Sequence, residues 1–196
     1  MPLLVVAALA EEVAHLPTGV EVLVTGVGKA RAAAALGRRL ADRPRPDVVV
    51  NVGTAGSVDG VITGVVEVTW VTQHDIPYDA IEALVGGTLD RGYALASAAT
   101  PVPMPTPPSG VTMLATGDVF VADGAHARRL AAQGIHLVDM EAFGFAAACA
   151  EFEVPFRCVK VVSDFADESA GESWIDTVDA CARSLGEWVA ALLRAE

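Results

Sequence analysis

The amino-acid sequence predicts an α/β protein built as a twisted β-sheet with helices on both faces. Short valine-rich runs alternate along the chain with alanine-rich stretches whose apolar residues recur at helical spacing, and this alternation is typical of strands buried on both faces. Hydrophobic residues make up 53% of the chain and charged residues 19%, which excludes a disordered chain. With 196 residues the chain is long enough for one substantial core and too short for two ordinary domains. We therefore expect residues 1–196 to form a single domain.

The predicted strands are the valine-rich runs, which in chain order cover residues 3–9, 21–26, 47–53, 65–71, 111–117, 134–139 and 156–164. A further segment, PVPMPTPPSG at residues 101–110, carries five prolines. Proline lacks an N–H donor and fixes its backbone, which excludes a helix interior and a central strand. We expect a stiff surface loop there, at an interface or beside a pocket.

Three helices are also clear from the sequence. Residues 28–42 are alanine-rich and end in a basic turn that suits the helix dipole. Residues 140–152 follow a strand directly, and Pro155 prevents their continuation. The C-terminal helix presents one apolar stripe at helical spacing, which predicts core packing or a dimer surface rather than a cofactor site. The stripe consists of Trp174, Ile175, Val178, Ala182, Leu185, Trp188, Val189, Leu192 and Leu193.

The composition argues against several classes of partner. A formal net charge of −12 disfavours a nucleic-acid backbone, which is bound by clustered lysine and arginine. No apolar stretch reaches the roughly 18 residues of a membrane helix, and the N-terminal segment meets two glutamates instead of the basic flank of a signal peptide. Cys149, Cys158 and Cys181 lack metal-ligand spacing and indicate reduced core thiols. We expect a soluble cytoplasmic protein with no metal and no nucleic-acid or membrane partner.

Two glycine-containing turns follow predicted strands. GVGKARA, from Gly26, lacks the third glycine of the dinucleotide motif and the spacing of a phosphate loop, so a plain turn and a ligand-facing turn are about equally supported. NVGTAGS, residues 51–57, follows the most strongly apolar strand. Gly53 and Gly56 would let the backbone approach a ligand there, and the Thr54 hydroxyl lies between them. A plain turn is the alternative for this motif too.

Three carboxylates lie where apolar segments meet turns. Glu12 follows the first strand, Glu141 starts the helix after the sixth, and Asp164 ends the seventh. Helix capping explains any one of them. If these strands are parallel, however, their carboxyl ends share one edge of the sheet and the three acids converge on one cleft. Such acids suit the cleavage of a glycosidic bond, in which an acid protonates the leaving group and a base activates water, while a third carboxylate holds ribose hydroxyls.

Several motifs occur together in an order typical of a known superfamily. VDMEAFGFAAACAEFEVPFRCVKVVSDFAD, residues 138–167, pairs Met-Glu with Ser-Asp, and AALAEEV, GVGKARAAAAL, NVGTAGS and TGDVFV precede it. Together they resemble the purine nucleoside phosphorylase and nucleosidase superfamily over nearly the whole chain, most of all its 5'-methylthioadenosine/S-adenosylhomocysteine nucleosidases. The resemblance implies a three-layer α/β/α domain with a central mixed sheet. It also implies a homodimeric purine nucleosidase that uses no cofactor.

The resemblance further implies a role for each matching residue. Asp164 matches the acid that protonates the purine at N7, Glu12 the carboxylate that positions or deprotonates the attacking water, and Glu141 the ligand of the ribose hydroxyls. Met140 is expected against the ribose, and Phe120 is expected to stack on the base. The other expected substrate contacts are the Val121 backbone, Thr54, Gly53 and Ser163.

The expected nucleophile is water. The hexameric phosphorylases of the superfamily carry one arginine just before the glycine motif and another in the first loop, whereas here Asn51 stands near the former position and AEEV replaces the latter. A phosphate dianion without those cations would be poorly held. The alternatives are a phosphorylase with an unconventional anion site, a futalosine-type hydrolase and an inactive nucleoside-binding protein. Phe143 and Phe145 are bulkier than the residues that usually follow Met-Glu, which predicts a reshaped pocket.

Overall fold

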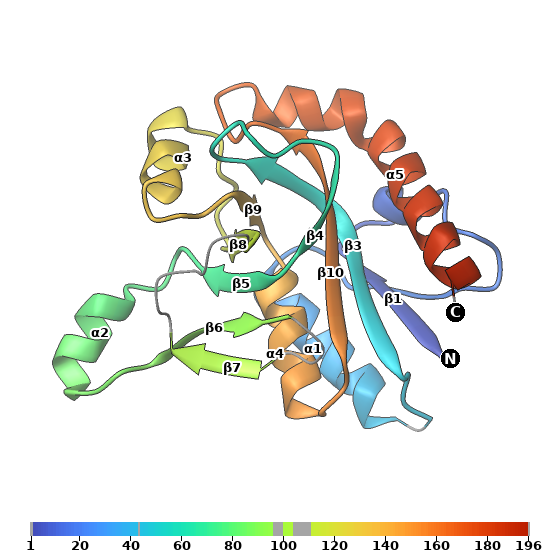
Figure 1. The fold of residues 1–196 in the computed structure, drawn as a ribbon, viewed down its shortest axis with the longest axis horizontal. Helices are drawn as coiled ribbons and strands as arrows, with labels where there is room; N and C mark the ends of the chain where they lie inside the picture. Colours follow the sequence, from blue (N-terminus) through green and yellow to red (C-terminus); the bar gives the residue numbers. More distant parts are fainter. Residues whose placement is uncertain (1, 43, 96–99, 104–110, 196) are drawn as a thin grey trace.

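The computed structural model describes residues 2–42, 44–95, 100–103 and 111–195, which form a mixed sheet with helices on both faces (Figure 1). The main path of the sheet runs β2-β1-β3-β9-β8-β5-β6-β7, and β10 and β4 join it through β3. The strands are β1 (Leu3–Ala7), β2 (Glu21–Val24), β3 (Val48–Ser57), β4 (Val65–Val68), β5 (Trp70–Gln73), β6 (Asp90–Ala94), β7 (Thr100–Pro103), β8 (Met113–Thr116), β9 (Leu137–Asp139) and β10 (Phe156–Asp164).

The helices complete three layers, so the expected α/β class with a central mixed sheet is confirmed. The α1 and α4 helices pack against each other on one face, and α5 packs against β10 and β3 on the other. Figure 1 shows α2 standing away from this body. The helices are α1 (Lys29–Ala41), α2 (Tyr78–Val85), α3 (Gly124–Ala131), α4 (Ala142–Glu151) and α5 (Ala170–Ala195), with a short 3-10 helix η1 (Glu11–Val13). None of these described helices is long and apolar enough to cross a membrane.

Side chains alternate along β1 and divide the core into two apolar layers. Leu4 and Val6 belong to the layer formed with α1 and α4, and Val5 and Ala7 to the layer formed with α5. Successive strand residues face opposite sides of a sheet, so a strand covered on both faces needs apolar residues at every position. This explains the continuous valine-rich runs of the sequence.

The longest described strand, β3, has an interruption on one edge that positions the site. Its other edge pairs with β10 from Val49 to Gly56. The interrupted edge pairs with β1 at its start, from Val48 to Asn51, and with β9 only at Gly56 and Ser57. Residues 52–55 therefore have no partner on this edge among the described strands, and their backbone groups are open to side chains.

The structure corrects three predicted strand or loop boundaries. Residues 65–71 are two strands, because β4 pairs with β10 whereas β5 pairs with β8 and β6. The first strand ends at Ala7 rather than at residue 9, and the chain then turns into η1. Residues 101–103 of the predicted loop belong to β7, paired with β6 at the end of the sheet path, where proline is tolerated. Residues 104–110 lie outside the described residues.

Candidate active site

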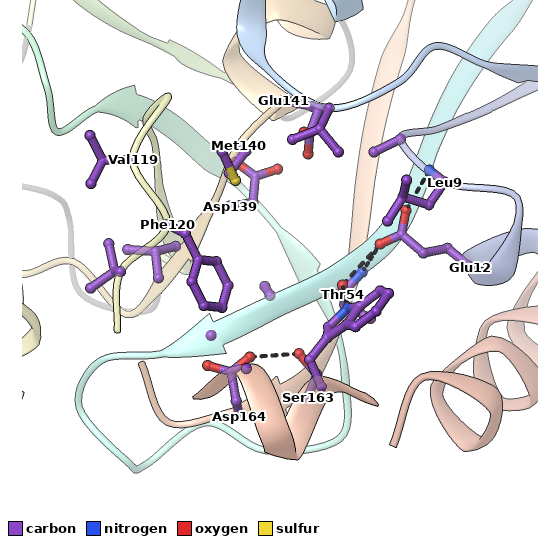
Figure 2. Close-up of a pocket in the computed structure, with 18 of the residues that line it drawn as sticks. Leu9, Glu12, Thr54, Val119, Phe120, Asp139, Met140, Glu141, Ser163 and Asp164 are labelled. Atoms are coloured by element: carbon purple, nitrogen blue, oxygen red, sulfur yellow. Dashed lines mark hydrogen bonds between the residues drawn. The ribbon is translucent and has the colours of Figure 1, made fainter. Parts of the chain in front are cut away.

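A cavity of about 370 Å³ opens beside the interrupted edge of β3 (Figure 2). It gathers side chains from the loop after β1, from β3, from the loops after β8 and β9, from the end of β10 and from α5. The lining residues are Ala8, Leu9, Glu12, Val27, Thr54, Ala55, Gly56, Val119, Phe120, Val121, Val138, Asp139, Met140, Glu141, Ser163, Asp164, Gly171, Trp174 and Ile175. All the predicted site residues except Gly53 are among them.

Hydrogen bonds hold Glu12 at the open edge of β3. Its Oε1 accepts from the Thr54 backbone N–H at 2.8 Å and from the Thr54 hydroxyl at 2.9 Å, and its Oε2 accepts from the Leu9 N–H at 3.1 Å. The Thr54 hydroxyl in turn accepts from Nε1 of Trp174 at 3.0 Å. Three donors thus fix a carboxylate that is only 5% exposed, which is the arrangement expected of a positioned base.

Asp164 is the last residue of β10 and lies next to Gly56 of β3. Its Oδ2 accepts from the Ser163 hydroxyl at 2.8 Å and its Oδ1 from the Ala166 N–H at 2.9 Å. A Cβ atom on Gly56 would stand 2.8 Å from Oδ1, so a glycine is needed for the carboxyl group to lie against β3. Since α5 begins only at Ala170, the capping alternative does not apply to Asp164.

Glu141 precedes α4, but its side chain does not cap that helix. Its Oε1 accepts from the Gly28 N–H at the start of α1, at 2.8 Å. Burial raises the pKa of Glu141 to about 7; the charges of Asp139 and Glu12 add to the rise, and Lys160 and the Gly28 N–H oppose it. Glu141 is thus a buried carboxyl group that changes its charge near neutral pH.

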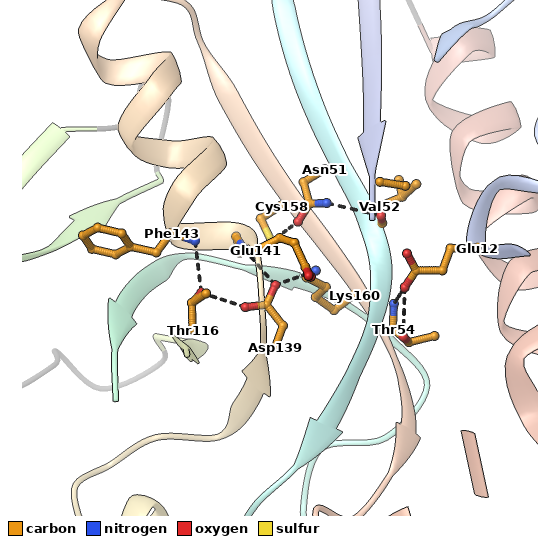
Figure 3. Close-up of polar contacts among 12 residues, drawn as sticks. Glu12, Asn51, Val52, Thr54, Thr116, Asp139, Glu141, Phe143, Cys158 and Lys160 are labelled. Atoms are coloured by element: carbon orange, nitrogen blue, oxygen red, sulfur yellow. Dashed lines mark hydrogen bonds and ion pairs between the residues drawn. The ribbon is translucent and has the colours of Figure 1, made fainter. Parts of the chain in front are cut away.

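A polar network lies behind Glu141 (Figure 3). Asp139 accepts from the Lys160 ammonium at 2.8 Å and from the Ala142 N–H at 3.0 Å through Oδ2, and from the Thr116 hydroxyl at 2.7 Å through Oδ1. The Thr116 hydroxyl accepts from the Phe143 N–H at 3.0 Å. Asp139 therefore provides the helix cap that the sequence suggested for Glu141.

The opposite part of the cavity is apolar. Figure 2 shows Phe120 and Met140 across the cavity from Glu12, with Val119 beyond them. The Phe120 side chain is half exposed, and Val121 next to it is buried in a third apolar cluster, with Ala127 and Leu130 of α3. An aromatic ring and a thioether suit the flat faces of a base and a sugar.

The acids converge for a different reason from the one expected. We expected parallel strands whose carboxyl ends share an edge, and β1, β3 and β10 are indeed parallel. The strand before Glu141, β9, is antiparallel to β3, and its Val138 pairs with Gly56. Its end therefore points back toward the middle of β3, and the three acids lie along this strand rather than at one end of it.

Several other expectations need correction. Gly53 lies outside the lining, and a Cβ atom on it would stand 3.0 Å from Glu12 Oε1 and 3.3 Å from Lys160 Nζ. Trp174 and Ile175 line the cavity, so the apolar stripe of α5 is not only core or dimer surface. Phe143 lies against Tyr93, 5.1 Å between ring centroids, and Phe145 is fully buried. Neither phenylalanine lines the cavity, so they do not reshape it directly.

Sequence reasoning also missed two residues of the network, Asp139 and Lys160. Lysine is almost never fully buried unless it is paired, and Lys160 lies between valines in a strand read as buried on both faces. That single lysine was the available signal for an ion pair at this position. Its partner Asp139 stands two residues before Glu141, within the motif that carried the resemblance.

The charged side chains that line the cavity are all acidic among the described residues. Four carboxylates line it, and no lysine, arginine or histidine does so among the described residues. Asn51 stands near the position at which an arginine is expected in a phosphorylase. It is buried and donates from Nδ2 to the backbone oxygens of Val6 and Val52. The cavity is therefore built for a neutral or cationic ligand and lacks a cation for phosphate.

Comparison with known proteins identifies the family of the chain. The family model described as the phosphorylase superfamily matches residues 14–195. A 5'-methylthioadenosine/S-adenosylhomocysteine nucleosidase of Exiguobacterium sp. is 30% identical over 187 residues, 89% of this chain and 80% of that protein. The Streptococcus pneumoniae MTA/SAH nucleosidase in complex with 8-aminoadenine superposes with a TM-score of 0.78 at 21% identity, covering 100% of both chains. The futalosine hydrolase of Helicobacter pylori gives 0.77 at 18% identity, covering 99% of this chain and 97% of the other.

Proposed function

The chain belongs to the phosphorylase superfamily, and from that premise we propose that it hydrolyses the N-glycosidic bond of a purine nucleoside to a free base and a sugar. The observation that carries the proposal is the cavity itself, which brings Glu12, Glu141 and Asp164 together with an aromatic and a thioether side chain. The named activity of the Exiguobacterium relative points to a methylthioadenosine or S-adenosylhomocysteine type of nucleoside.

Asp164 is the proposed general acid. The bond between C1′ of the sugar and N9 of the purine breaks with its electron pair moving to the purine, and the proton of the Asp164 carboxyl group moves to N7. Protonation of the leaving group lowers the barrier to an oxocarbenium-like transition state. The Ser163 hydroxyl, 2.8 Å from Oδ2, holds the carboxyl group and also contacts the substrate in this proposal.

Glu12 is the proposed base. A water molecule forms the new bond to C1′, and its proton moves to the Glu12 carboxylate, so one proton is given by Asp164 and one is taken up by Glu12. Thr54 holds Oε1 of Glu12 through two hydrogen bonds, which aligns the base, and it also lies near the sugar. Gly53 serves the site by leaving space between Glu12 and Lys160.

The remaining lining residues bind the substrate in this proposal. The Glu141 carboxylate accepts hydrogen bonds from the ribose hydroxyls, Met140 lies against the ribose, and Phe120 stacks on the base. The backbone of Val121 contacts the purine edge. No metal or organic cofactor takes part in these steps.

Hydrolysis is favoured over phosphorolysis because the polar groups that could hold an anion at β3 are already bound to a carboxylate. The Thr54 N–H and hydroxyl both donate to Glu12, and no lysine, arginine or histidine among the described residues lines the cavity to pair with a phosphate dianion. The test is the release of base with and without phosphate. We expect equal rates and free sugar; a phosphate requirement with formation of ribose 1-phosphate would show a phosphorylase instead.

The acid assignment is tested with Asp164→Asn. An amide cannot deliver the proton, so base release should fall by roughly 10²- to 10⁴-fold, while the thermal unfolding temperature stays near that of the parent. Retained turnover in a reducing-sugar assay would contradict the assignment. Binding of nucleoside without turnover by the parent protein would instead support the inactive binding protein.

A panel of nucleosides tests which substrate the protein prefers. Structures of both MTA/SAH nucleosidases and a futalosine hydrolase share this fold, so the fold does not separate these substrates. Methylthioadenosine, S-adenosylhomocysteine, adenosine, inosine and futalosine are compared for release of free base. We expect methylthioadenosine or S-adenosylhomocysteine to give the highest kcat/KM, and a preference for futalosine would move the chain to that group.

We propose in addition that residues 1–196 act as one domain and form a cytoplasmic homodimer. Three buried free cysteines suit a reducing compartment. Val119, Phe120 and Ile175 are exposed beside the cavity mouth, an apolar surface that a second copy would cover. The molar mass in light scattering tests the dimer, and a monomer at micromolar concentration would exclude it.

A further inference from the structure

Lys160 is a buried cation among buried acids. Its side chain is 2% exposed, and it is the only lysine or arginine among the buried residues that the structure describes. The buried carboxylates number four: Glu12, Asp139, Glu141 and Asp164. A single cation that neutralises part of such a cluster controls which of the acids stay ionised.

The position of Lys160 follows from the register of the sheet. Lys160 pairs with Gly53 across β10 and β3, and its neighbour Cys158 belongs to the core layer under α1 and α4. Its ammonium crosses over Gly53, where a Cβ atom would stand 3.3 Å from Nζ, and reaches Asp139 at 2.8 Å. Figure 3 shows the Lys160–Asp139 ion pair and Glu141 on one side of β3, with Glu12 on the other side.

Lys160 does not itself line the cavity. Burial works against its charge, but the nearby acidic groups raise the pKa of its ammonium above the ordinary value, Asp139 first and then Cys158, Glu12 and Glu141. It therefore remains a cation while Glu141 titrates. The groups that act on the Glu141 carboxyl group are Asp139 from β9, Lys160 from β10, the Gly28 N–H from the start of α1 and Glu12 from η1.

We propose that Lys160 is a positioning residue that favours the ionised form of Glu141, acting from behind the cavity through its charge and its salt bridge with Asp139. A protonated Glu141 would have less acceptor capacity for ribose hydroxyls, because one of its oxygens then carries a proton and donates. Glu141 as the sugar ligand rests on the proposed function, whereas the charge relation between Lys160 and Glu141 does not.

Two substitutions with opposite expected effects on the titration midpoint of Glu141 test the proposal. Lys160→Met replaces the cation with an uncharged side chain of similar length and should raise the titration midpoint of Glu141 by about one to three pH units. Asp139→Asn removes the like charge, leaves Lys160 in place and should lower that midpoint. Lys160→Arg keeps the cation and should leave the midpoint near that of the parent.

The midpoint is measured by carbon NMR titration of the glutamate carboxyl groups in the unliganded protein, with Glu141→Gln identifying the signal. In parallel, the acid limb of the pH profile of kcat/KM should shift in the same direction for each variant. A purely structural role would lower activity at every pH and leave both midpoints unmoved, which would overturn the proposal.

The outcomes separate this proposal from the proposed function. If the NMR midpoints move as stated and no nucleoside is hydrolysed, the charge relation stands and the function fails. If Lys160→Met does not fold, Asp139→Asn and Lys160→Arg still decide the matter. An unchanged or raised midpoint in Asp139→Asn, or a midpoint in Lys160→Arg as high as that expected for Lys160→Met, would refute the role of Lys160.

Discussion

The two glutamates that line the cavity, Glu12 and Glu141, are held in different ways. Glu12 accepts three hydrogen bonds, two from Thr54 and one from Leu9. Glu141 accepts one, from the Gly28 N–H, and shares its surroundings with Asp139 and Lys160. Both are buried. Hydrogen bonds thus fix the position of Glu12, whereas burial first, and then the surrounding charges, set the ionisation of Glu141.

The largest expected effect is that of Glu12→Gln. The amide cannot take a proton from water, and its NH₂ group would meet either the Leu9 N–H or the two donors of Thr54, since only one side of the amide accepts. We expect kcat to fall by roughly 10²- to 10⁴-fold and the unfolding temperature to drop. Base release and differential scanning fluorimetry measure the two effects. An unchanged kcat would show that Glu12 is not the base.

Glu141→Gln should have the opposite effect on stability at alkaline pH. The folded-state pKa of Glu141, about 7, lies above the ordinary value of 4.5. Protonation of Glu141 therefore stabilises the folded state fully below about pH 4.5, and this stabilisation is lost as the pH rises through 7. The glutamine amide oxygen can still accept the hydrogen bond from the Gly28 N–H, and the amide does not ionise as the pH rises. The variant should gain unfolding temperature relative to the parent at pH 8 and much less at pH 5. An equal difference at both pH values would contradict the charge account.

Sequence reasoning found the acids because each one is marked locally. Glu12, Glu141 and Asp164 stand at the boundaries of strongly patterned segments, and β9, α4 and β10 around Glu141 and Asp164 were recognised from the same pattern, whereas η1, which carries Glu12, was not. The direction of β9 relative to β3 was not predicted, because antiparallel pairing at Gly56 depends on how distant segments cross the sheet. Local patterns specify an element and do not specify its neighbour.

The supporting residues were missed for the same physical reason. Trp174 donates to Thr54 across 120 positions of sequence, and its apolar spacing in α5 gave only the signal of a core residue. Lys160 finds Asp139 through the register of β10 and β3. Contacts of this kind depend on tertiary packing, so a sequence pattern predicts the residues that carry the chemistry better than those that hold them.

Gly53→Ala should disturb Glu12 and Lys160 at once. The added methyl group would stand 3.0 Å from Glu12 Oε1 and 3.3 Å from Lys160 Nζ, so both side chains must shift. Because a small misplacement of a catalytic group is costly, we expect kcat/KM to fall by about tenfold. Gly87→Ala is the matched control, since nothing lies within 4 Å of its added Cβ, and it should leave activity unchanged. Equal activity of the two variants would show that the space at Gly53 is not needed.

The smallest expected effect concerns the support of Glu12 from α5. Trp174→Phe keeps an aromatic ring in the cavity lining and removes the indole N–H that donates to Thr54 at 3.0 Å. The Thr54 hydroxyl would then be free to rotate away from Glu12, and the loss of one such hydrogen bond corresponds to a roughly 2- to 10-fold change. We expect that change in kcat with KM nearly constant, because the base is affected more than the binding surface.

Trp188→Phe on the same helix is the control for this change. Trp188 lies under the Arg157 guanidinium, 5.0 Å from ring centroid to Cζ, and is not part of the cavity lining, so its substitution should affect stability and leave kcat unchanged. If Trp174→Phe raised KM and left kcat unchanged, Trp174 would be a binding surface only, and the position of Glu12 would depend on Thr54 and Leu9 alone.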